Sequence, residues 1–237
     1  MNNIEAVNGK YPEWDSIVGA LKKWRGNLQN ADPQANPIKN PSVTTVAERY
    51  KNDPWAVLVS TILSLRTKDE VTLKCSRVLL AKAPTPQKLF ALKEEEIAKL
   101  AYPAGFYRTK AANLKKIAAI LLEQYKGKVP ANLDTLLGLP GVGRKTANLV
   151  LIEAFDMDGI CVDIHVHRIS NRAGWLASKN PEETEMILRD TLPKKYWKIL
   201  NALLVLYGQN ICRPISPYCS RCVIAGHCKK VGVGKTR

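Results

Sequence analysis

Apolar residues recur at the spacing of an α-helix through almost the whole chain. The clearest run is Leu114, Ile117, Ala118, Leu121 and Leu122, which follows i, i+3, i+4, i+7, i+8. No segment alternates apolar and polar residues as a half-buried strand would. The pattern predicts an all-α fold of about ten helices with short connections.

Capping signals place several of these helices. Asp53 and Pro54 supply an N-cap and a first-turn proline before the apolar run 55–65. Thr85 and Pro86 do the same for a later helix. These signals predict helix starts at both positions.

Three further segments carry structural expectations. The run 67–70, Thr-Lys-Asp-Glu, has the pattern of a capping box, and it precedes a helix whose apolar face includes Cys75. We expect Cys75 to be a small core residue. A first helix is expected near residues 14–24. Residues 27–44, rich in Asn and Pro, are expected to form a linker or surface loop.

Length and charge narrow the class of protein. The 237 residues suit one large domain or two small ones, and 46% of them are apolar, which excludes disorder as the main state. No apolar run approaches the roughly 18 residues of a membrane span. The first residues lack the basic segment of a secretory signal, so we expect an intracellular protein. A net charge of +15 favours a nucleic-acid partner over a basic surface without one.

The positive charge is concentrated near the C-terminus. Residues 191–237 contain nine Lys or Arg and no acidic residue. A stretch of one sign is either a disordered tail or an anion-binding surface. Apolar residues such as Trp197, Leu200 and Leu204 run through it. We therefore expect a folded, anion-binding surface.

Four cysteines follow each other with the spacing C-x6-C-x2-C-x5-C: Cys212, Cys219, Cys222 and Cys228. In an intracellular protein such a cluster indicates a metal site before disulfides, with four unrelated thiols as the alternative. Four thiolates suit tetrahedral zinc or an iron–sulfur cluster. Zinc ribbons usually show two C-x2-C pairs, and this segment has one, so the spacing leans towards the bulkier cluster.

Residues 132–155 predict a short helix, a tight Pro-Gly-Val-Gly turn and a second helix. Gly141 and Gly143 can take positive φ and allow close backbone approach. The amides that begin the second helix would then bind phosphate. An ordinary helix–helix turn remains the alternative, since Gly-x-Gly alone is weak evidence.

Lys145 falls in the first turn of that second helix, where a cation opposes the helix dipole. The same field favours the neutral amine that a Schiff-base nucleophile needs. A simple phosphate contact is equally compatible with the position. Both roles stay open on local context.

Asp163 precedes a helical run that ends at Gly174, and its plainest role is an N-cap. A capping carboxylate is also held rigidly and stays ionised, so the cap is compatible with a chemical role. His165 and His167 are two residues apart and do not share a helix face, which argues against a metal pair. His165 has two interpretations, a phosphate contact and a satisfied structural histidine.

The segments Leu139–Ala147 and Val162–Ile169, followed by the four cysteines, together resemble endonuclease III, the bifunctional DNA glycosylase/AP lyase of the helix–hairpin–helix superfamily. The resemblance runs from about residue 46 to 228. It implies two helical domains that flank a DNA-binding cleft. The implied domains are a six-helix barrel at 45–156, with the hairpin at 132–155, and a discontinuous domain at 1–44 and 157–237, with a [4Fe-4S] cluster loop at 212–228.

The resemblance also implies roles for individual residues. Lys145 matches the catalytic lysine, Asp163 the catalytic aspartate, and the four cysteines the cluster ligands. The expected DNA contacts come from both implied domains: Arg66, Phe106, Leu139, Gly141, Val142, Gly143, Arg144, His165, Arg213, Arg221, Lys229 and Lys230.

Three positions depart from the family pattern. Arg66 stands where the family commonly has a glutamine that enters the space left by a flipped base, which leaves the opposite-base preference open. Phe106 is the candidate for the second, apolar wedge, with a core aromatic as the alternative. Ile164 replaces a commonly smaller or polar neighbour of the aspartate.

The implied function is base excision repair of oxidised or damaged pyrimidines in duplex DNA, followed by strand cleavage 3′ to the abasic site. We expect a monomer that acts on damaged bases and abasic sites, without a membrane, cytoplasmic and nucleoid-associated if the source is prokaryotic. A monofunctional mismatch glycosylase is one alternative, but such relatives generally lack a lysine at the place of Lys145. A noncatalytic iron–sulfur protein for DNA binding or electron transfer is the other, and it has no need of Lys145 together with Asp163.

Overall fold

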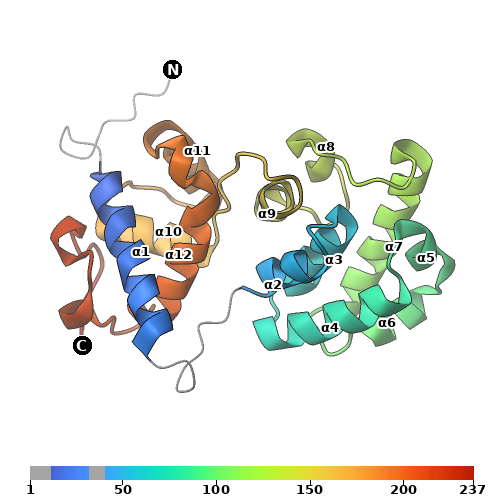
Figure 1. Cartoon of the computed structure of the whole chain (residues 1–237), viewed down its shortest axis with the longest axis horizontal. Coiled ribbons are helices and arrows are strands. Elements are labelled where there is room, and N and C mark those ends of the chain that lie inside the picture. Colours follow the sequence, from blue (N-terminus) through green and yellow to red (C-terminus); the bar gives the residue numbers. More distant parts are fainter. Residues whose placement is uncertain (1–11, 32–40) are drawn as a thin grey trace. The chain divides into compact units, whose positions relative to one another are not determined.

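The computed structural model describes residues 12–31 and 41–237 (Figure 1). Every regular element in these ranges is a helix, so the all-α prediction is confirmed. The α-helices in chain order are α1 (Trp14–Ala31), α2 (Ser42–Arg49), α3 (Pro54–Ser64), α4 (Asp69–Lys82), α5 (Pro86–Ala91), α6 (Glu94–Ala101), α7 (Tyr107–Tyr125), α8 (Leu133–Leu137), α9 (Arg144–Phe155), α10 (Ile164–Ala173), α11 (Pro181–Thr191) and α12 (Trp197–Asn210). Short 3-10 turns are η2 (Lys194–Tyr196), η3 (Cys219–Arg221) and η4 (Ala225–His227).

The described residues divide into two compact units. Residues 41–159 form the continuous unit, and residues 12–31 with 160–237 form the discontinuous unit. Each unit has an apolar core of its own. Each core therefore supports the elements of one unit only.

Helix α3 is the centre of the continuous unit. Its residues from Trp55 to Leu63 are all buried, and it packs against α2, α4, α7 and α9. Such an enclosed helix is apolar on every face. Asp53 caps it by accepting the Ala56 N–H at 2.8 Å, and Pro54 occupies the first turn. Both predicted signals are confirmed, as is the Thr85 cap of α5.

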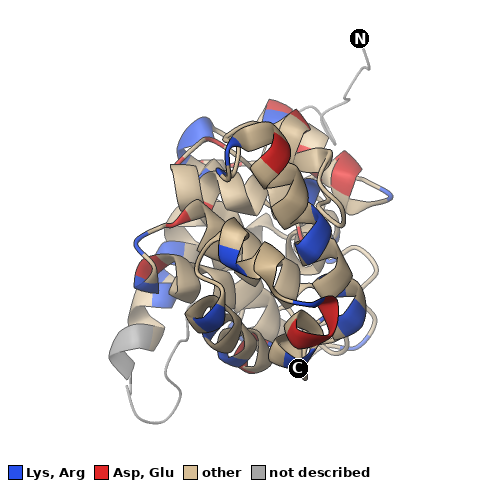
Figure 2. Ribbon diagram, turned by 90° about the vertical axis from the view of Figure 1, so that its right-hand side faces the viewer, with Lys and Arg blue, Asp and Glu red and all other residues tan. Residues whose placement is uncertain are grey.

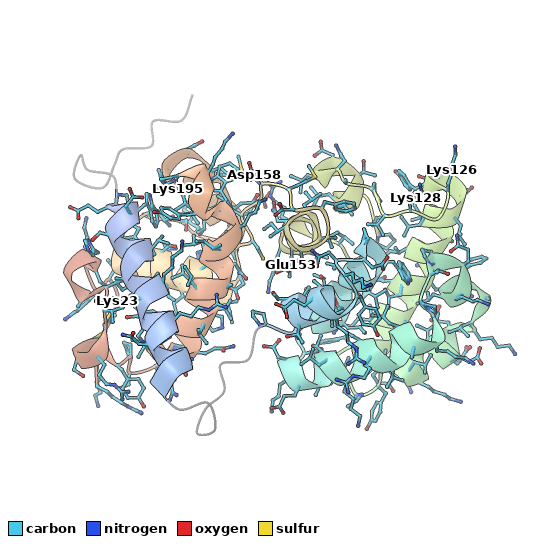
Figure 3. All side chains as sticks on the ribbon, in the orientation of Figure 1. Lys23, Lys126, Lys128, Glu153, Asp158 and Lys195 are labelled. Carbon is cyan, nitrogen blue, oxygen red and sulfur yellow. The ribbon has the colours of Figure 1, made fainter. Side chains whose placement is uncertain are left out.

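Helix α7 buries the apolar stripe that the sequence indicated, including Leu114, Ile117 and Leu121. It ends where Lys126 takes a left-handed conformation and Gly127 follows with a φ of +73°. Figure 3 shows Lys126 and Lys128 at this end of the helix. Cys75 of α4 is buried in the same core, as expected.

The core of the discontinuous unit combines segments from both ends of the chain. Helix α12 packs against α1 and α10. Tyr207 of α12 is fully buried, and Trp24 of α1 meets its ring edge-on at 4.8 Å between centroids. The stretch that follows the last acidic residue is thus folded, as its apolar residues predicted.

Two local predictions are wrong. Lys68, not Thr67, is the N-cap of α4, and no side chain caps this helix. The Thr67 hydroxyl instead donates to the Leu65 carbonyl and accepts the N–H of Gly105, in the loop before α7. Residues 27–31 and 42–44, expected in a loop, belong to α1 and α2, and at the start of α2 Ser42 and Val43 are buried. The rest of that expected loop, 32–40, lies outside the described residues, as do residues 1–11 of the expected discontinuous domain.

Within the described ranges, no helix is long and apolar enough to cross a membrane.

Candidate active site, hairpin and cysteine segment

The turn between α8 and α9 depends on one glycine. Gly141 has a φ of +75°, and a Cβ at this position would lie 2.4 Å from Asn113 Nδ2. The Val142 N–H donates to the Leu139 carbonyl at 3.1 Å and closes the turn. The side chains of Leu139 and Val142 are buried in the core of the continuous unit. Any contact that these two residues make with DNA therefore falls to their backbone atoms.

Gly143 corrects the expectation that both glycines have positive φ. Its φ is −95° and its ψ 177°, an extended conformation open to any residue. It is the N-cap of α9, yet it offers no side-chain acceptor to the first-turn amides. A Cβ here would meet nothing within 4 Å. The absent side chain leaves space before a helix N-terminus, where an anion binds well.

Lys145 is exposed in the first turn of α9, next to the half-buried Arg144. Both side chains add positive charge to a helix end that is already positive. Two cations in the first turn oppose the helix dipole. The position therefore suits an anionic or electrophilic partner better than it suits helix stability.

A partly buried hydrogen bond links helix α9 to α2. The Thr44 hydroxyl donates to Glu153 Oε1 at 2.8 Å, and Figure 3 places Glu153 on α9. Burial raises the pKa of the Glu153 carboxyl, the Thr44 bond opposes the rise, and the nearby Glu48 adds to it. This contact helps to hold the helix that presents Lys145.

Asp163 is the N-cap of α10, as its position predicted. Its Oδ1 accepts the N–H groups of His165 and Val166, both at 2.9 Å, and the residue is only 8% exposed. These bonds fix the carboxylate in one orientation. Asp163 belongs to the discontinuous unit, whereas Lys145 belongs to the continuous unit.

His165 lies in a packed contact with α12. Its Nδ1 is 3.1 Å from an Arg168 Nη atom, and a Cβ on Gly208 would lie 2.4 Å from the same ring nitrogen. Arg168 also donates to the carbonyls of Gly208 and Cys212, at 3.3 and 2.9 Å. His165 therefore supports the junction between α10 and the cysteine segment.

His167 has a different set of partners. Its Nδ1 is 2.7 Å from the Thr184 hydroxyl on α11. The two histidines therefore have different neighbours: His165 lies against Arg168, and His167 against Thr184.

Hydrogen-bond donors point at the sulfur atoms of the cysteine segment. Arg172 lies 3.4 Å from Cys212 Sγ, the Tyr207 hydroxyl 3.2 Å from Cys222 Sγ, and the Lys230 N–H 3.4 Å from Cys228 Sγ. Donors of this kind stabilise thiolates and tune iron–sulfur clusters. Among the described residues, no three His, Cys, Asp or Glu side chains form a group that could hold a metal ion.

The chemistry of the four thiols can still be tested against the implied cluster. Burial raises the pKa values of Cys219 and Cys228, and the neighbouring cysteines raise them further. A bound metal centre would offset both effects, because it favours the thiolate form. An iron–sulfur cluster accepts four cysteine thiolates, so the donor set fits that group.

Basic residues near the C-terminus gather around one half-buried ring. Arg213, Arg221 and Arg237 lie 5.2, 5.5 and 5.4 Å from the centroid of the Tyr218 ring. Arg237 donates to the Tyr218 hydroxyl at 3.1 Å, which is the main reason that the Tyr218 pKa is lowered. Arg237 was not predicted as a site residue, although it lies in the acid-free stretch.

The two neighbouring lysines are held by the backbone. The Lys229 N–H donates to the Ala173 carbonyl at 2.9 Å, and its side-chain stem lies against Gly174 at the end of α10. The Lys230 N–H donates to Cys228 Sγ, as described above.

In Figure 2, Lys and Arg residues occur on many elements, with Asp and Glu residues among them.

Arg66 and Phe106, expected as two wedges, lie together in the continuous unit. The Arg66 guanidinium carbon is 5.5 Å from the centroid of the Phe106 ring. Phe106 is 62% exposed, which excludes a core aromatic as its role.

Lys110 is buried near both residues, and it was not predicted from the sequence as a site residue. The sequence contained a sign of this, because a lysine four residues before Leu114 lies on the apolar face of the predicted helix.

Comparison with known proteins assigns this arrangement to a class. Residues 59–194 match the HhH-GPD superfamily of base excision DNA repair proteins. The matched range includes the hairpin, Lys145 and Asp163.

Individual relatives are more specific. The chain is 46% identical to endonuclease III of Thermotoga maritima over 79% of this chain and 89% of that protein. It is 45% identical to the chloroplastic endonuclease III homolog 2 of Arabidopsis thaliana over 91% of this chain, but it spans only 57% of that longer protein. A solved structure of a trapped covalent intermediate of endonuclease III with DNA is 31% identical, with a TM-score of 0.73, over 90% of this chain and 94% of that one.

The chain belongs to the endonuclease III family. It is accordingly a DNA glycosylase of base excision repair that binds DNA.

Proposed function

We propose that this glycosylase is bifunctional: it removes oxidised or damaged pyrimidines and then cleaves the strand as an AP lyase. The observation that carries the proposal is the position of Lys145, exposed in the first turn of a helix whose N-terminus has no side-chain cap. A related endonuclease III was captured as a covalent intermediate with DNA, which supports a protein nucleophile in this family.

The target base must leave the stack before it can be attacked. The neutral Lys145 amine attacks C1′ of the deoxyribose, the N–C1′ bond forms, and the bond from C1′ to the base breaks. The base departs with the bonding electrons and takes up a proton. The sugar ring then opens as the C1′–O4′ bond breaks, and a protonated imine links C1′ to Lys145.

Asp163 acts on the charge that develops during these steps. Its carboxylate is held by two amides, so it can stabilise positive charge on the sugar without reorganising. It also takes part in the proton transfers that the amine requires.

Strand cleavage follows from the imine. The imine acidifies the C2′ hydrogen, and removal of that proton expels the 3′ phosphate oxygen. The C3′–O bond breaks in this β-elimination, which cuts the strand 3′ to the abasic site.

Several groups bind and orient the DNA in this proposal. The amides at the start of α9, with Gly141 and Gly143, bind phosphate together with Arg144. In the discontinuous unit, Arg213, Arg221, Lys229 and Lys230 add phosphate contacts, and His165 holds α10 against α12. Arg66 and Phe106 fill the space that the flipped nucleotide leaves.

Cys212, Cys219, Cys222 and Cys228 would hold a [4Fe-4S] cluster. A bound cluster would cross-link residues 212–228 and so hold the neighbouring basic residues in place. Ligation by four cysteines would leave no open position for a substrate. Iron and sulfide analysis of the purified protein and of a Cys222→Ser variant tests this part of the proposal. The variant is expected to lose both elements.

Borohydride trapping tests the lyase directly. The wild-type protein, Lys145→Gln and the control Lys116→Gln, an exposed lysine of α7, are each incubated with a duplex that contains one abasic site. We expect a covalent adduct with the wild type and the control, and none with Lys145→Gln.

Other results would change the function. A wild type that forms no adduct but excises a mispaired adenine or thymine is a monofunctional glycosylase. A wild type that binds the duplex without excision or trapping is a noncatalytic DNA-binding protein. We also expect the protein to bind DNA as a monomer. The mass of its complex with the same duplex checks this expectation.

A further inference from the structure

The loops that carry Arg66 and Phe106 are joined by their backbones as well as by their side chains. The Gly105 N–H donates to the Thr67 hydroxyl at 3.0 Å. A Cβ on Gly105 would lie 2.5 Å from the Arg66 carbonyl oxygen, so the two loops touch where only glycine fits. The loops that carry the exposed Arg66 and Phe106 are therefore packed directly against each other.

Both residues also have a backbone conformation that side chains rarely adopt. The φ of Arg66 is 52° and that of Phe106 is 57°. A bulky residue persists in this region only where the surrounding structure determines it. The source of that constraint has to lie in the contacts beneath the two loops.

Lys110 supplies these contacts. It projects from the second turn of α7 and is only 5% exposed. Its Nζ donates to the carbonyls of Leu63 and Leu65, at 2.8 and 2.5 Å, and to the Thr67 hydroxyl at 2.8 Å. Three acceptors match the three N–H bonds of an ammonium group.

The position of the Lys110 ammonium group attracts a positive charge, but its burial disfavours the charged form. The carbonyls at the end of α3 lack helical partners, and a positive charge is favourable at a helix C-terminus. Burial lowers the pKa of Lys110 to about 8, because few atoms other than these oxygens replace the lost water. A buried lysine is unusual. Here its amino group bonds both to the carbonyls at the end of α3 and to the Thr67 hydroxyl, which in turn accepts the N–H of Gly105 in the second loop.

We propose that Lys110 is a positioning residue that holds Arg66 and Phe106 together as one preassembled wedge for the gap that a flipped nucleotide leaves. The inference rests on the proposed function, since a wedge is useful only to an enzyme that extrudes its target base. Lys110 touches neither substrate nor reacting atoms. It acts by fixing the two loops that do.

The test separates a reaction that needs the wedge from one that does not. Excision of thymine glycol from a duplex requires the base to be flipped and its place filled. Cleavage of an abasic site in single-stranded DNA requires neither. The readout is the ratio of the two single-turnover rates, which a general loss of folded protein does not change.

Lys110→Met keeps the length of the side chain and removes the three hydrogen bonds. We expect duplex excision to fall about 30-fold, while single-strand cleavage stays within about twofold of wild type. In an Arg66→Ala, Phe106→Ala background, the added Lys110→Met change is expected to lower the ratio no further, because the wedge is already gone.

The matched control is another lysine of α7. Lys115 donates to the carbonyls of Phe90 and Leu92 at the end of α5, so it has the same kind of structural contact without contact to the wedge loops. Lys115→Met is expected to lower stability and to leave the ratio unchanged. If Lys110→Met and Lys115→Met give the same ratio as wild type, the inference is wrong.

A second variant covers the case in which Lys110→Met does not fold. Thr67→Val preserves the shape of the side chain and removes the acceptor shared by Lys110 and Gly105. We expect the ratio to fall about tenfold. A wild-type protein that processes neither substrate would refute the proposed function, whereas active variants with an unchanged ratio refute only the role of Lys110.

Discussion

Helices α9 and α10 begin in opposite ways. The first turn of α10 is capped by Asp163, whose Oδ1 accepts two backbone amides. The first turn of α9 follows Gly143, has no side-chain cap and contains Lys145. A capping aspartate stabilises a helix by about 1 kcal/mol, and a cation in the first turn destabilises it by roughly 0.3–1 kcal/mol.

The difference shows what each helix end is for. The α10 end satisfies its own amides and so holds a carboxylate still. The α9 end has no capping side chain at Gly143, so its positive field can act on a group from outside the protein. Four substitutions can break or sharpen this contrast.

Lys145→Gln should have the largest effect. The AP lyase rate is expected to fall at least about a thousandfold, since no other residue replaces the nucleophile. The free energy of unfolding should rise by about 0.5 kcal/mol, because a charge that opposes the helix dipole is removed. Single-turnover cleavage and urea unfolding measure the two changes. A loss of DNA affinity without a loss of maximal rate would make Lys145 a phosphate contact instead.

Asp163→Asn should separate the two roles of the α10 cap. Asparagine caps as well as aspartate, so the unfolding free energy should stay within about 0.5 kcal/mol of wild type. The excision rate should fall about a hundredfold, because the negative charge is lost. Asp163→Ala is the companion variant, and it should lose the same activity and about 1 kcal/mol of stability as well. An active Asp163→Asn protein would leave the residue with a structural role alone.

Gly141→Ala tests whether the α9 end depends on its turn. Alanine disfavours a φ of +75°, and its Cβ would press on Asn113 Nδ2. Urea unfolding should show a loss of about 2 kcal/mol. Gly138→Ala is the control, since a Cβ there meets its nearest atom at 3.4 Å in an α-helical conformation. Equal stability of the two variants would contradict the strained turn.

Gly143→Asp should change both stability and DNA binding only modestly, and the opposite signs of the two changes are the informative part. The backbone and the open space at Gly143 accept a side chain, so the new cap should stabilise the protein by about 0.5 kcal/mol. The carboxylate would also repel phosphate, and affinity for duplex DNA should fall about tenfold. Gly143→Asn provides a neutral cap of the same shape and should weaken binding less. Tighter binding by the Asp variant would show that DNA phosphate does not approach this end.

Much of the fold was predictable because its causes are local. Asp53 with Pro54 and Thr85 with Pro86 begin helices through contacts within one turn. The stripe from Leu114 to Leu121 follows from periodicity alone. The predicted capping box at Thr67 failed for a non-local reason, because the hydroxyl accepts hydrogen bonds from Gly105 of another loop and from Lys110 of α7.

The same division holds for the site. The cap role of Asp163 and the turn at Gly141 depend on neighbours in sequence and could be predicted. Lys110 and Arg237 could not, since their partners lie 43 and 19 residues away. A lysine on an apolar helix face was a visible anomaly, but its acceptors became known only with the packing.

The sequence by itself determined the helical class, the hairpin, the capped aspartate and the cysteine segment, because periodicity, glycine φ and residue chemistry act over a few residues. Tertiary structure decided that Arg66 stacks on Phe106, that Lys110 is buried beneath them, and that three arginines surround Tyr218. Burial and pairing depend on which helices pack together, and that choice is made by the whole core rather than by any one segment.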